Sequence, residues 1–211
     1  MPRLPRGRHG LAREFVVRNQ RDRLTAGIIA AVAEHGYHEA TVSQICAGAG
    51  VSRRTFYTYF SSKGECYVEA FDRIIDFLTE AMAEASDDER GWPERVRSRF
   101  ATLLDIFAAN PNLARFVLIV PPRAGDGVAE HQRLALARVL EGLARGRPRT
   151  GIRKTPAAVE QTLLGGSMSL IAHKVEKGEE DTLAEVLPDL VELFLTPFIG
   201  RDEAMRIARG V

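Results

Sequence analysis

Apolar residues recur every three or four positions along almost the whole chain, which is the spacing of one buried face of an α-helix. Strict alternation of apolar and polar residues, the sign of a half-buried strand, is rare. The one ambiguous run, residues 116–120, follows Asn110-Pro111, a pair typical of a helix start, so we interpret it as the end of a buried helix. Clusters of Gly, Pro and Ser divide the chain into about nine or ten helices, which predicts an all-α fold.

Residues 41–60 predict two short helices joined by a tight turn. The sequence from Thr41 to Gln44 has the form of a capping box, with a hydroxyl at the N-cap and an amide three residues later. Gly50 supplies the turn, and Ser52 suits the N-cap of a second helix over residues 53–60. This arrangement is typical of a helix-turn-helix, whose second helix can enter the major groove of DNA. A surface helical hairpin without a nucleic-acid partner is the alternative that geometry alone leaves open.

The preceding segment supports the same unit, because a bare helix-turn-helix cannot bury its own core. Residues 22–35 carry an apolar stripe at helical spacing that could cover both short helices. Residues 23–71 resemble the DNA-binding domain of TetR-type (TetR/AcrR) transcriptional regulators. The motifs that carry the resemblance are Gly36-Tyr37, Thr41-Val42, Gly50-Val51-Ser52, Thr55-Phe56-Tyr57-x-Tyr59-Phe60 and Lys63.

The resemblance implies a three-helix DNA-binding domain, a long fourth helix from Ser62 and a larger helical domain that binds a ligand and dimerises. Such a protein is a transcriptional regulator, most often a repressor, whose homodimer binds a palindromic double-stranded DNA operator and is released by a small-molecule effector. The family pattern places Thr41 on a phosphate, Ser52, Arg53, Arg54 and Thr55 at the start of the recognition helix, and Tyr57, Tyr59 and Lys63 on the DNA backbone. Tyr59 and Gly64 depart from the pattern, which often has His and an acidic residue there.

Charge is divided unevenly along the chain, although 29 Lys+Arg against 28 Asp+Glu give a net charge of only +1 over 211 residues. Residues 1–63 hold ten basic and four acidic residues, a net charge of +6, and the other 19 basic and 24 acidic residues give −5. Such an asymmetry indicates that nucleic-acid binding is confined to one end. We expect three parts: a basic arm at 1–18, the helix-turn-helix domain at 19–79 and the ligand and dimer domain at 80–211.

The arm is rich in Arg, Gly and Pro and poor in apolar residues. Arg3, Arg6 and Arg8 could enter the minor groove of DNA, where Arg is attracted by negative potential; the alternative is a solvated tail. A second Arg-rich stretch, residues 142–156, is interpreted as a solvated loop. The N-terminus lacks the apolar block of a secretory signal, and no stretch is apolar enough to span a bilayer, so we expect a cytoplasmic protein without a membrane partner.

The last two long helices, residues 156–177 and 183–198, are the expected dimer surface. The first contains Gly165-Gly166-Ser167, which permits close helix approach, and the second is apolar on much of its circumference. An entirely intramolecular core is the alternative. The expected dimer residues are Val159, Leu163, Gly166, Leu170, Leu187, Leu190, Val191 and Phe194.

The middle helices should enclose an effector pocket, and its mainly apolar lining favours a hydrophobic ligand. Each of these residues could instead belong to the packed core. The residues expected to line the pocket are Phe71, Ile74, Leu78, Phe100, Leu103, Leu104, Phe107, Phe116, Met168 and His173.

Catalytic and metal-binding patterns are missing from the sequence. It has no Gly-x-Ser-x-Gly elbow, His-Glu-x-x-His, Walker loop or Cys-x-x-Cys, and its five His are scattered. Cys46 fits a small core position, whereas Cys66, near a helix start, could hold an activated thiolate. We therefore expect no enzyme, no catalytic residue, no metal and no cofactor. An all-α enzyme or small-molecule carrier with a helix pair that does not bind DNA is the rival hypothesis.

Overall fold

The computed structural model describes residues 13–85, 90–120 and 126–210. Within these ranges the chain forms ten α-helices and one 3-10 helix, without a strand, which confirms the all-α prediction. In chain order the elements are α1 (Arg13–Glu39), α2 (Val42–Ala49), α3 (Arg53–Tyr59), α4 (Lys63–Glu84), α5 (Trp92–Ala109), α6 (Pro111–Leu118), α7 (Asp126–Ala144), α8 (Ala157–Lys177), η2 (Glu180–Val186), α9 (Leu187–Ile199) and α10 (Arg201–Arg209).

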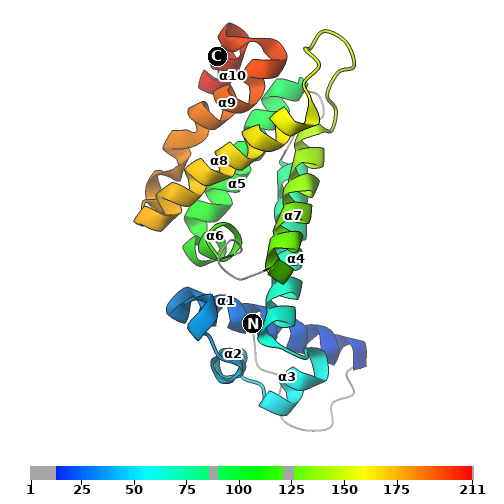
Figure 1. Ribbon diagram of the computed structural model, residues 1–211, viewed down its shortest axis with the longest axis vertical. Coiled ribbons are helices and arrows are strands. Elements are labelled where there is room, and N and C mark those ends of the chain that lie inside the picture. The colour runs from blue at the N-terminus through cyan, green and yellow to red at the C-terminus, as the bar shows by residue number, and fades with distance from the viewer. Residues whose placement is uncertain (1–12, 86–89, 121–125, 211) are drawn as a thin grey trace.

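Helices α1 to α3 form a small cluster at one end of an elongated molecule, and α5 to α10 form a larger body at the other end (Figure 1). The small cluster has its own core, in which Leu24, Ile28, Ile45 and Phe56 are fully buried. Helix α1 crosses α2 at Gly27, where an added Cβ would lie 2.6 Å from the carbonyl oxygen of Ile45. Only glycine permits this approach, so the backbones of the two helices are in close contact.

The arm predicted at residues 1–18 lies mostly outside the described residues. Residues 13–18 already belong to α1, and Arg3, Arg6 and Arg8 lie outside the described residues. At its other end α1 is interrupted at Gly36, whose φ of 77° lies in the left-handed region. The ambiguous run 116–120 contains the end of α6, which begins at Pro111 and ends at Leu118, so the predicted helix end is confirmed.

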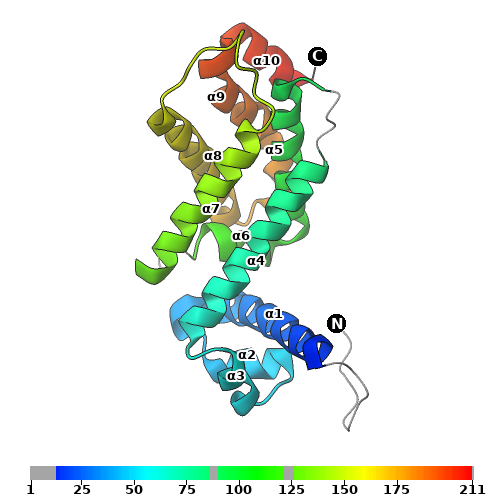
Figure 2. The same ribbon diagram turned by 90° about the vertical axis from the view of Figure 1, so that its right-hand side faces the viewer.

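Helix α4 connects the two parts, running from the small cluster into the larger body beside α7 (Figure 2). The predicted domain boundary at residue 79 falls inside this helix, because α4 supplies buried residues to both cores. Arg73 of α4 pairs with Asp22 of α1, whereas its neighbour Asp72 binds His131 and Arg138 of α7 at 3.0 and 3.4 Å. Consecutive residues of α4 therefore form ion pairs with the two parts of the molecule, Arg73 with the small cluster and Asp72 with the larger body.

The loop at residues 142–156, which was predicted to be solvated, packs against the helices at the end of the larger body far from α1 to α3. The guanidinium of Arg147 lies over the rings of Trp92 and Phe198, 5.0 and 4.5 Å from their centroids. The same group makes a bidentate ion pair with Glu160 of α8 at 2.7 and 3.0 Å. Farther along, the amide of Arg153 donates to the carbonyl of Phe198 at 2.9 Å. The loop thus contains a buried clamp between α5, α8 and α9, although most of its other residues are exposed.

Candidate DNA-binding face and effector cavity

Local hydrogen bonds set the geometry of the turn between α2 and α3. The predicted capping box is present: the Gln44 amide donates to Thr41 Oγ1 at 3.3 Å, and the Thr41 amide donates to Gln44 Oε1 at 2.8 Å. Gly50 ends α2 with a φ of 61°, as a left-handed helix cap requires. Its carbonyl accepts a 2.5 Å hydrogen bond from Arg23 of α1. The turn is therefore held both by its own caps and by the supporting helix.

Helix α3 begins at Ser52, whose Oγ accepts a 3.0 Å hydrogen bond from the Thr55 amide. Beyond this cap, Arg53, Arg54 and Tyr57 are exposed, and Thr55 is half-buried. Cationic and hydroxyl side chains on one slim helix suit base edges and phosphates. We call Arg53, Arg54, Tyr57 and Thr58 the α3 face. Figure 1 shows α3 at the end of the molecule far from α8 to α10, where it is open to a partner.

Thr58 is absent from the residues expected from sequence, although it follows Arg54 by four positions and is therefore on the same side of α3. Its hydroxyl donates to the Arg54 carbonyl at 2.9 Å, and the side chain is exposed. Ser43 is a further addition, since its Oγ accepts a 3.3 Å hydrogen bond from Arg53. Thr41, at the start of α2, is also exposed. The exposed set thus includes both short helices.

Two residues expected on the DNA backbone are used inside the protein instead. The Lys63 ammonium donates to the carbonyls of Tyr37, His38 and Ala40 at 2.6, 3.0 and 2.9 Å. These three bonds use all three ammonium hydrogens, so Lys63 caps the C-terminal end of α1. The Tyr59 hydroxyl donates to Gln20 of α1 at 2.6 Å, with Arg21 over its ring. In this structure both side chains are therefore engaged within the protein, and their contacts with phosphate stay predictions.

Cys66 does not have the environment of an activated thiolate. It is buried in the first turn of α4, and the loss of solvation, assisted by the neighbouring Glu69 carboxylate, raises the pKa of its thiol to about 12. Cys46, on α2, is also buried, and burial raises the pKa of its thiol, although the Arg53 charge opposes this shift. Both thiols are consequently protonated at neutral pH.

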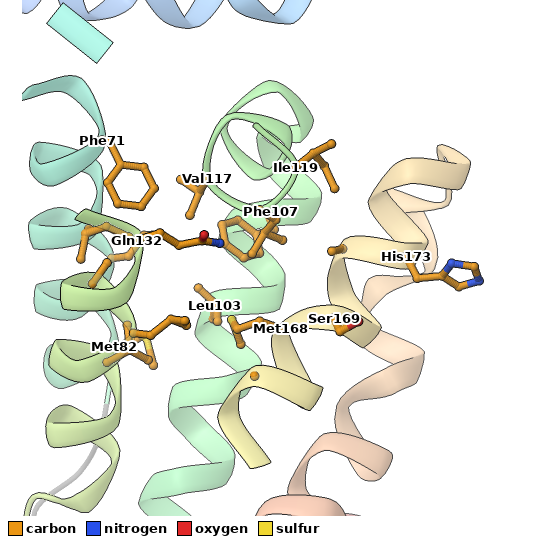
Figure 3. A pocket seen from close by; sticks show the side chains of 18 of the residues that line it. Phe71, Met82, Leu103, Phe107, Val117, Ile119, Gln132, Met168, Ser169 and His173 are labelled. Carbon is orange, nitrogen blue, oxygen red and sulfur yellow. The ribbon is translucent and has the colours of Figure 1, made fainter. Parts of the chain in front are cut away.

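An apolar cavity of about 440 Å³ lies between α4, α5, α6, α7 and α8, and we call it the effector cavity (Figure 3). Six of the residues predicted for the pocket line it: Phe71, Leu78, Leu103, Phe107, Met168 and His173. The imidazole of His173, however, points away from the cavity, whereas the amide of Gln132 reaches into it beside Phe107 (Figure 3). Gln132 and the other α7 residues were missed, because the amphipathic pattern of α7 does not distinguish a cavity wall from packed core.

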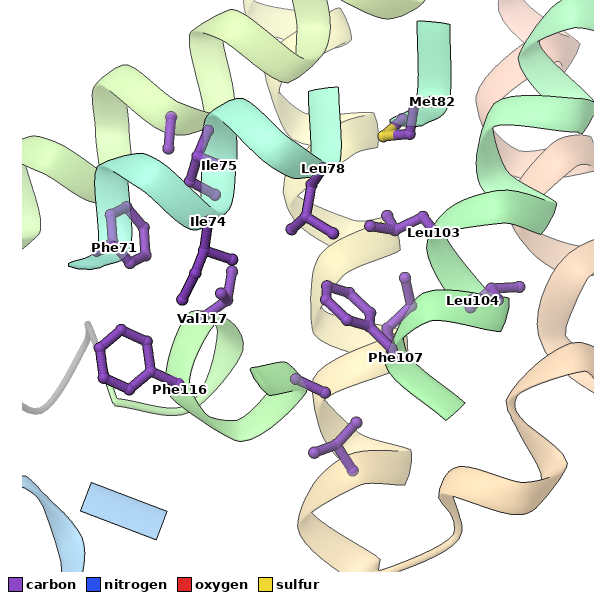
Figure 4. Packing of buried hydrophobic residues seen from close by; sticks show 14 of the residues in the cluster. Phe71, Ile74, Ile75, Leu78, Met82, Leu103, Leu104, Phe107, Phe116 and Val117 are labelled. Atoms are coloured by element: carbon purple, nitrogen blue, oxygen red, sulfur yellow. The ribbon is translucent and has the colours of Figure 1, made fainter. Parts of the chain in front are cut away.

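Four residues predicted for the pocket are packing residues instead. Phe116 packs against Tyr67 of α4 with 4.3 Å between ring centroids, and Ile74 is buried in the same region between α4 and α6 (Figure 4). Phe100 packs edge-on against Phe194 of α9, at 5.7 Å. Leu104 points to the side of α5 away from α4 (Figure 4). Their burial is correct, but their contacts are with other helices rather than with an open volume.

The predicted dimer residues divide into two groups. Val159 and Leu170 of α8 are exposed, and Leu163, Gly166 and Leu187 are partly exposed. Leu190, Val191 and Phe194 are fully buried within the subunit, so their assignment to a surface is wrong. Helix α9 instead exposes Leu193, a residue not expected from the sequence, and Leu193 lies 3.9 Å from where a Cβ of Gly166 would stand. The open apolar surface is therefore made of Val159, Leu170 and Leu193.

The arrangement is that of a two-part helical protein with a helix-turn-helix at one end and a ligand-sized cavity in the other. Residues 24–70 match the family model described as "Bacterial regulatory proteins, tetR family". The chain is 31% identical to the HTH-type transcriptional repressor AcnR of Corynebacterium diphtheriae over 186 residues, which covers 82% of this chain and 90% of AcnR. The chain therefore belongs to the TetR family of bacterial regulatory proteins.

A second relative is the HTH-type transcriptional repressor SCO4008 of Streptomyces coelicolor, 28% identical over 110 residues. This match covers 52% of the chain and spans about half, 54%, of SCO4008. Among solved structures, the transcriptional regulator FadR of Bacillus subtilis in complex with stearoyl-CoA superposes with a TM-score of 0.70 at 19% identity, over 83% of this chain and 98% of FadR. This last likeness concerns the fold.

The described residues contain neither a candidate membrane span nor a candidate metal site. None of their helices is long and apolar enough to cross a membrane. Within the same ranges, no group of three or more His, Cys, Asp or Glu side chains is placed to hold a metal ion.

Proposed function

We propose that this protein is a ligand-responsive, sequence-specific DNA-binding transcriptional regulator, most simply a repressor that leaves its operator when a small apolar effector binds. One observation carries the proposal: α4 follows directly from the helix-turn-helix and also supplies Phe71, Leu78 and Met82 to the effector cavity. A ligand that changes the position of α4 therefore acts on the domain that presents the α3 face. No enzymatic reaction is part of this proposal.

The operator contact is assigned to the α3 face. Arg53 and Arg54 are exposed at the N-terminal turn of α3, which is the part of a recognition helix that reaches base edges. Arg binds guanine edges bidentately, so these two residues are the proposed base readers. Thr41 and Tyr57 are the proposed phosphate contacts. Ser52 and Thr55 then act mainly by capping and orienting α3.

A homodimer is proposed, because a single helix-turn-helix reads only one half of a palindromic operator. The exposed apolar residues Val159 and Leu170 of α8 and Leu193 of α9 support a two-fold contact through these two helices. Their side chains are large and apolar, and burial of such surface favours association. Leu163, Gly166 and Leu187 would form the partly buried border of this contact.

An apolar effector is supported by the lining of the cavity, which is mostly aliphatic and aromatic. The volume of about 440 Å³ falls within the range of small-molecule sites, roughly 300–1,000 Å³. The FadR structure with stearoyl-CoA is an example of the same fold with a long acyl chain as its ligand. Gln132 is the proposed polar group that orients the ligand inside the cavity.

Selection of bound DNA from a random pool tests the DNA-binding function. We expect a palindromic site whose half-sites are about one helical turn of DNA apart. Arg54→Ala should relax the preference at one position of each half-site, whereas the parent protein should bind the selected site at least about 1,000-fold more tightly than random DNA. Absence of any enriched sequence, at low as well as physiological salt, would favour the carrier or enzyme hypothesis instead.

A further inference from the structure

A second hollow adjoins the effector cavity and has the opposite chemical character. Its volume is about 220 Å³, and it shares Met82 of α4 and Val139 of α7 with the effector cavity as a common wall. Three arginines line it: Arg99 of α5, Arg138 of α7 and Arg145, which directly follows α7. We call this volume the arginine hollow. The two spaces are neighbours, separated by the side chains that line both.

The charges of the two spaces differ sharply. Among the described residues, the effector cavity is lined by one carboxylate, Glu176, and by no Lys or Arg. Over the same described part of the chain, the arginine hollow is lined by three guanidinium groups and one carboxylate, Glu141, and Arg138 also pairs with Asp72 and Asp76. Arginine binds carboxylate and phosphate groups bidentately, and it is retained for this purpose where the partner is an anion. The described lining of the hollow therefore offers guanidinium donors to an anionic group, whereas that of the cavity offers none.

The arginines are set at different depths. Arg99 is a charged residue with only 4% of its surface exposed, and its Nη1 donates to the Gly142 carbonyl at 2.5 Å. Arg138 is half-buried and joins α7 to α4 through Asp76 at 2.6 Å and Asp72 at 3.4 Å. Arg145 is exposed at the outer end of α7. Cationic side chains thus extend from the protein interior to the surface on one side of the hollow.

The change from apolar to cationic lining occurs within one or two helical turns. On α5, Leu103 lines the effector cavity and Arg99, four residues earlier, lines the hollow. On α7, Leu136 lines only the effector cavity and Arg138 only the hollow, whereas Val139 lines both. At the boundary, Met82 is an unbranched, flexible side chain that can adapt to a chain passing beside it (Figure 3). Met82 and Val139 are therefore the side chains that a molecule extending from one space into the other would contact.

We propose that the effector is an amphiphile whose aliphatic chain fills the effector cavity and whose anionic head, a carboxylate or a phosphate, binds the arginine hollow at Arg99, Arg138 and Arg145. This inference rests on the proposed function and specifies the ligand class of the same site. An anion at Arg138 competes with Asp72 and Asp76 for the guanidinium. Binding of the head would thereby weaken the link between α7 and α4, while the chain holds the cavity walls.

Calorimetric titration of the full chain, without DNA, tests the head group. The probes are decanoate, decyl phosphate, decanol and decylammonium, with decanol kept below its solubility limit and the others below their critical micelle concentrations. We expect at least one of the two anions to bind about tenfold or more tightly than decanol, and decylammonium to bind most weakly. The decanoate and decyl phosphate titrations distinguish the two sources of negative charge. Equal affinity for decanol and both anions would overturn the arginine hollow as a head-group site.

Variants locate the site. Arg145→Ala changes an exposed residue and should leave folding intact, yet weaken the tighter anion roughly tenfold and leave decanol binding unchanged. Arg149→Ala removes an exposed arginine outside both spaces and is the matched control. Arg99→Lys should retain part of the affinity that Arg99→Gln loses. If Arg145→Ala and Arg149→Ala have the same effect on the anion, the assignment is wrong.

The outcomes separate this inference from the proposed function. If decanol binds the cavity as tightly as the anions, the apolar effector remains supported and the anionic head is excluded. If the protein selects no DNA sequence but binds decyl phosphate through Arg145, the ligand class is correct and the regulatory function is not.

Discussion

The hydroxyl group of Tyr67 donates a 2.6 Å hydrogen bond to the carbonyl oxygen of Phe116, and their rings lie 4.3 Å apart. Both residues are buried, and the contact joins α4 to the short helix α6, whose Val117 lines the effector cavity. Desolvation of this site raises the pKa of the Tyr67 phenol well above its usual value, so the hydroxyl is present as the neutral donor that the bond requires. The pair connects the cavity to the helix that leads to the DNA-binding domain.

Tyr67→Phe should lower the free energy of unfolding by about 1–3 kcal/mol, because the Phe116 carbonyl is left buried without this donor. Urea denaturation followed by circular dichroism measures the change. Tyr57→Phe, at an exposed position of α3, is the control and should change stability by less than about 0.5 kcal/mol. Equal stability of Tyr67→Phe and the parent would show that water replaces the lost donor.

Gly27→Ala should destabilise the protein by roughly 1–3 kcal/mol, since the new methyl group would lie 2.6 Å from the backbone oxygen of Ile45 and force α1 and α2 apart. Gly48→Ala faces the same crossing from α2, but its methyl group would have no neighbour closer than 3.5 Å. That variant should gain up to about 1 kcal/mol from helix propensity. Thermal denaturation of both variants shows whether each is less or more stable than the parent. A loss of stability in both variants would mean that the crossing tolerates neither methyl group.

Lys63→Met should lower stability by about 2 kcal/mol or more, since three carbonyls at the end of α1 lose a charged donor. If Lys63 makes no phosphate contact, the slope of log affinity against log salt for operator DNA should remain that of the parent. Arg54→Ala should reduce that slope by up to about one unit without changing stability, because Arg54 is exposed. A lower slope for Lys63→Met would restore its assignment to phosphate.

Leu170→Glu and Leu193→Glu should convert the proposed dimer to monomers, because each places a charge in an apolar contact between subunits. Sedimentation equilibrium gives the molecular mass in solution. Leu134→Glu introduces the same charge at an equally exposed leucine of α7 and should leave the association state unchanged. Dimerisation through another surface would be indicated if Leu134→Glu alone produced monomers.

Cys66 should react slowly with thiol reagents at pH 8, since burial raises the pKa of its thiol to about 12 and leaves very little thiolate. Urea should increase the labelling rate in step with unfolding, because the exposed thiol returns to its ordinary pKa of about 9. The Cys46→Ser variant isolates the Cys66 signal. Rapid labelling of the native protein would instead indicate local opening of α4.

Local chemistry made the helix-turn-helix predictable from the sequence. Thr41, Ser52 and Gly50 each act within a few residues of their own position, and all three have the predicted conformations. Lys63 and Tyr59 could not be assigned in this way. Their partners, the carbonyl groups at the end of α1 and Gln20, are between 23 and 39 residues away along the chain. A polar side chain on the outer face of its own helix can still form its hydrogen bonds with a different helix.

The cavity and the dimer surface were harder to predict for a related reason. Phe100 and Phe107 share the inner side of α5 and the same helical pattern, yet Phe107 lines an open volume and Phe100 is covered by Phe194. Periodicity reports that a residue is buried, but not what buries it. For the same reason Phe194 of α9 was predicted at the dimer surface, whereas Leu193 is the residue exposed there. Successive residues of a helix point about 100° apart.

Asp72 and Arg73 bind opposite parts of the molecule from adjacent positions on α4. Rotation of α4 about its own axis would lengthen both ion pairs at once, whereas a tilt of the helix would leave most of each contact in place. In the proposed dimer, ligand binding in the cavity would therefore change the distance and angle between the two recognition helices. Each three-helix unit would stay intact, because α1 and α2 cross closely at Gly27. Such a motion would change how well the protein fits the spacing of the operator half-sites more than how it reads their base sequence.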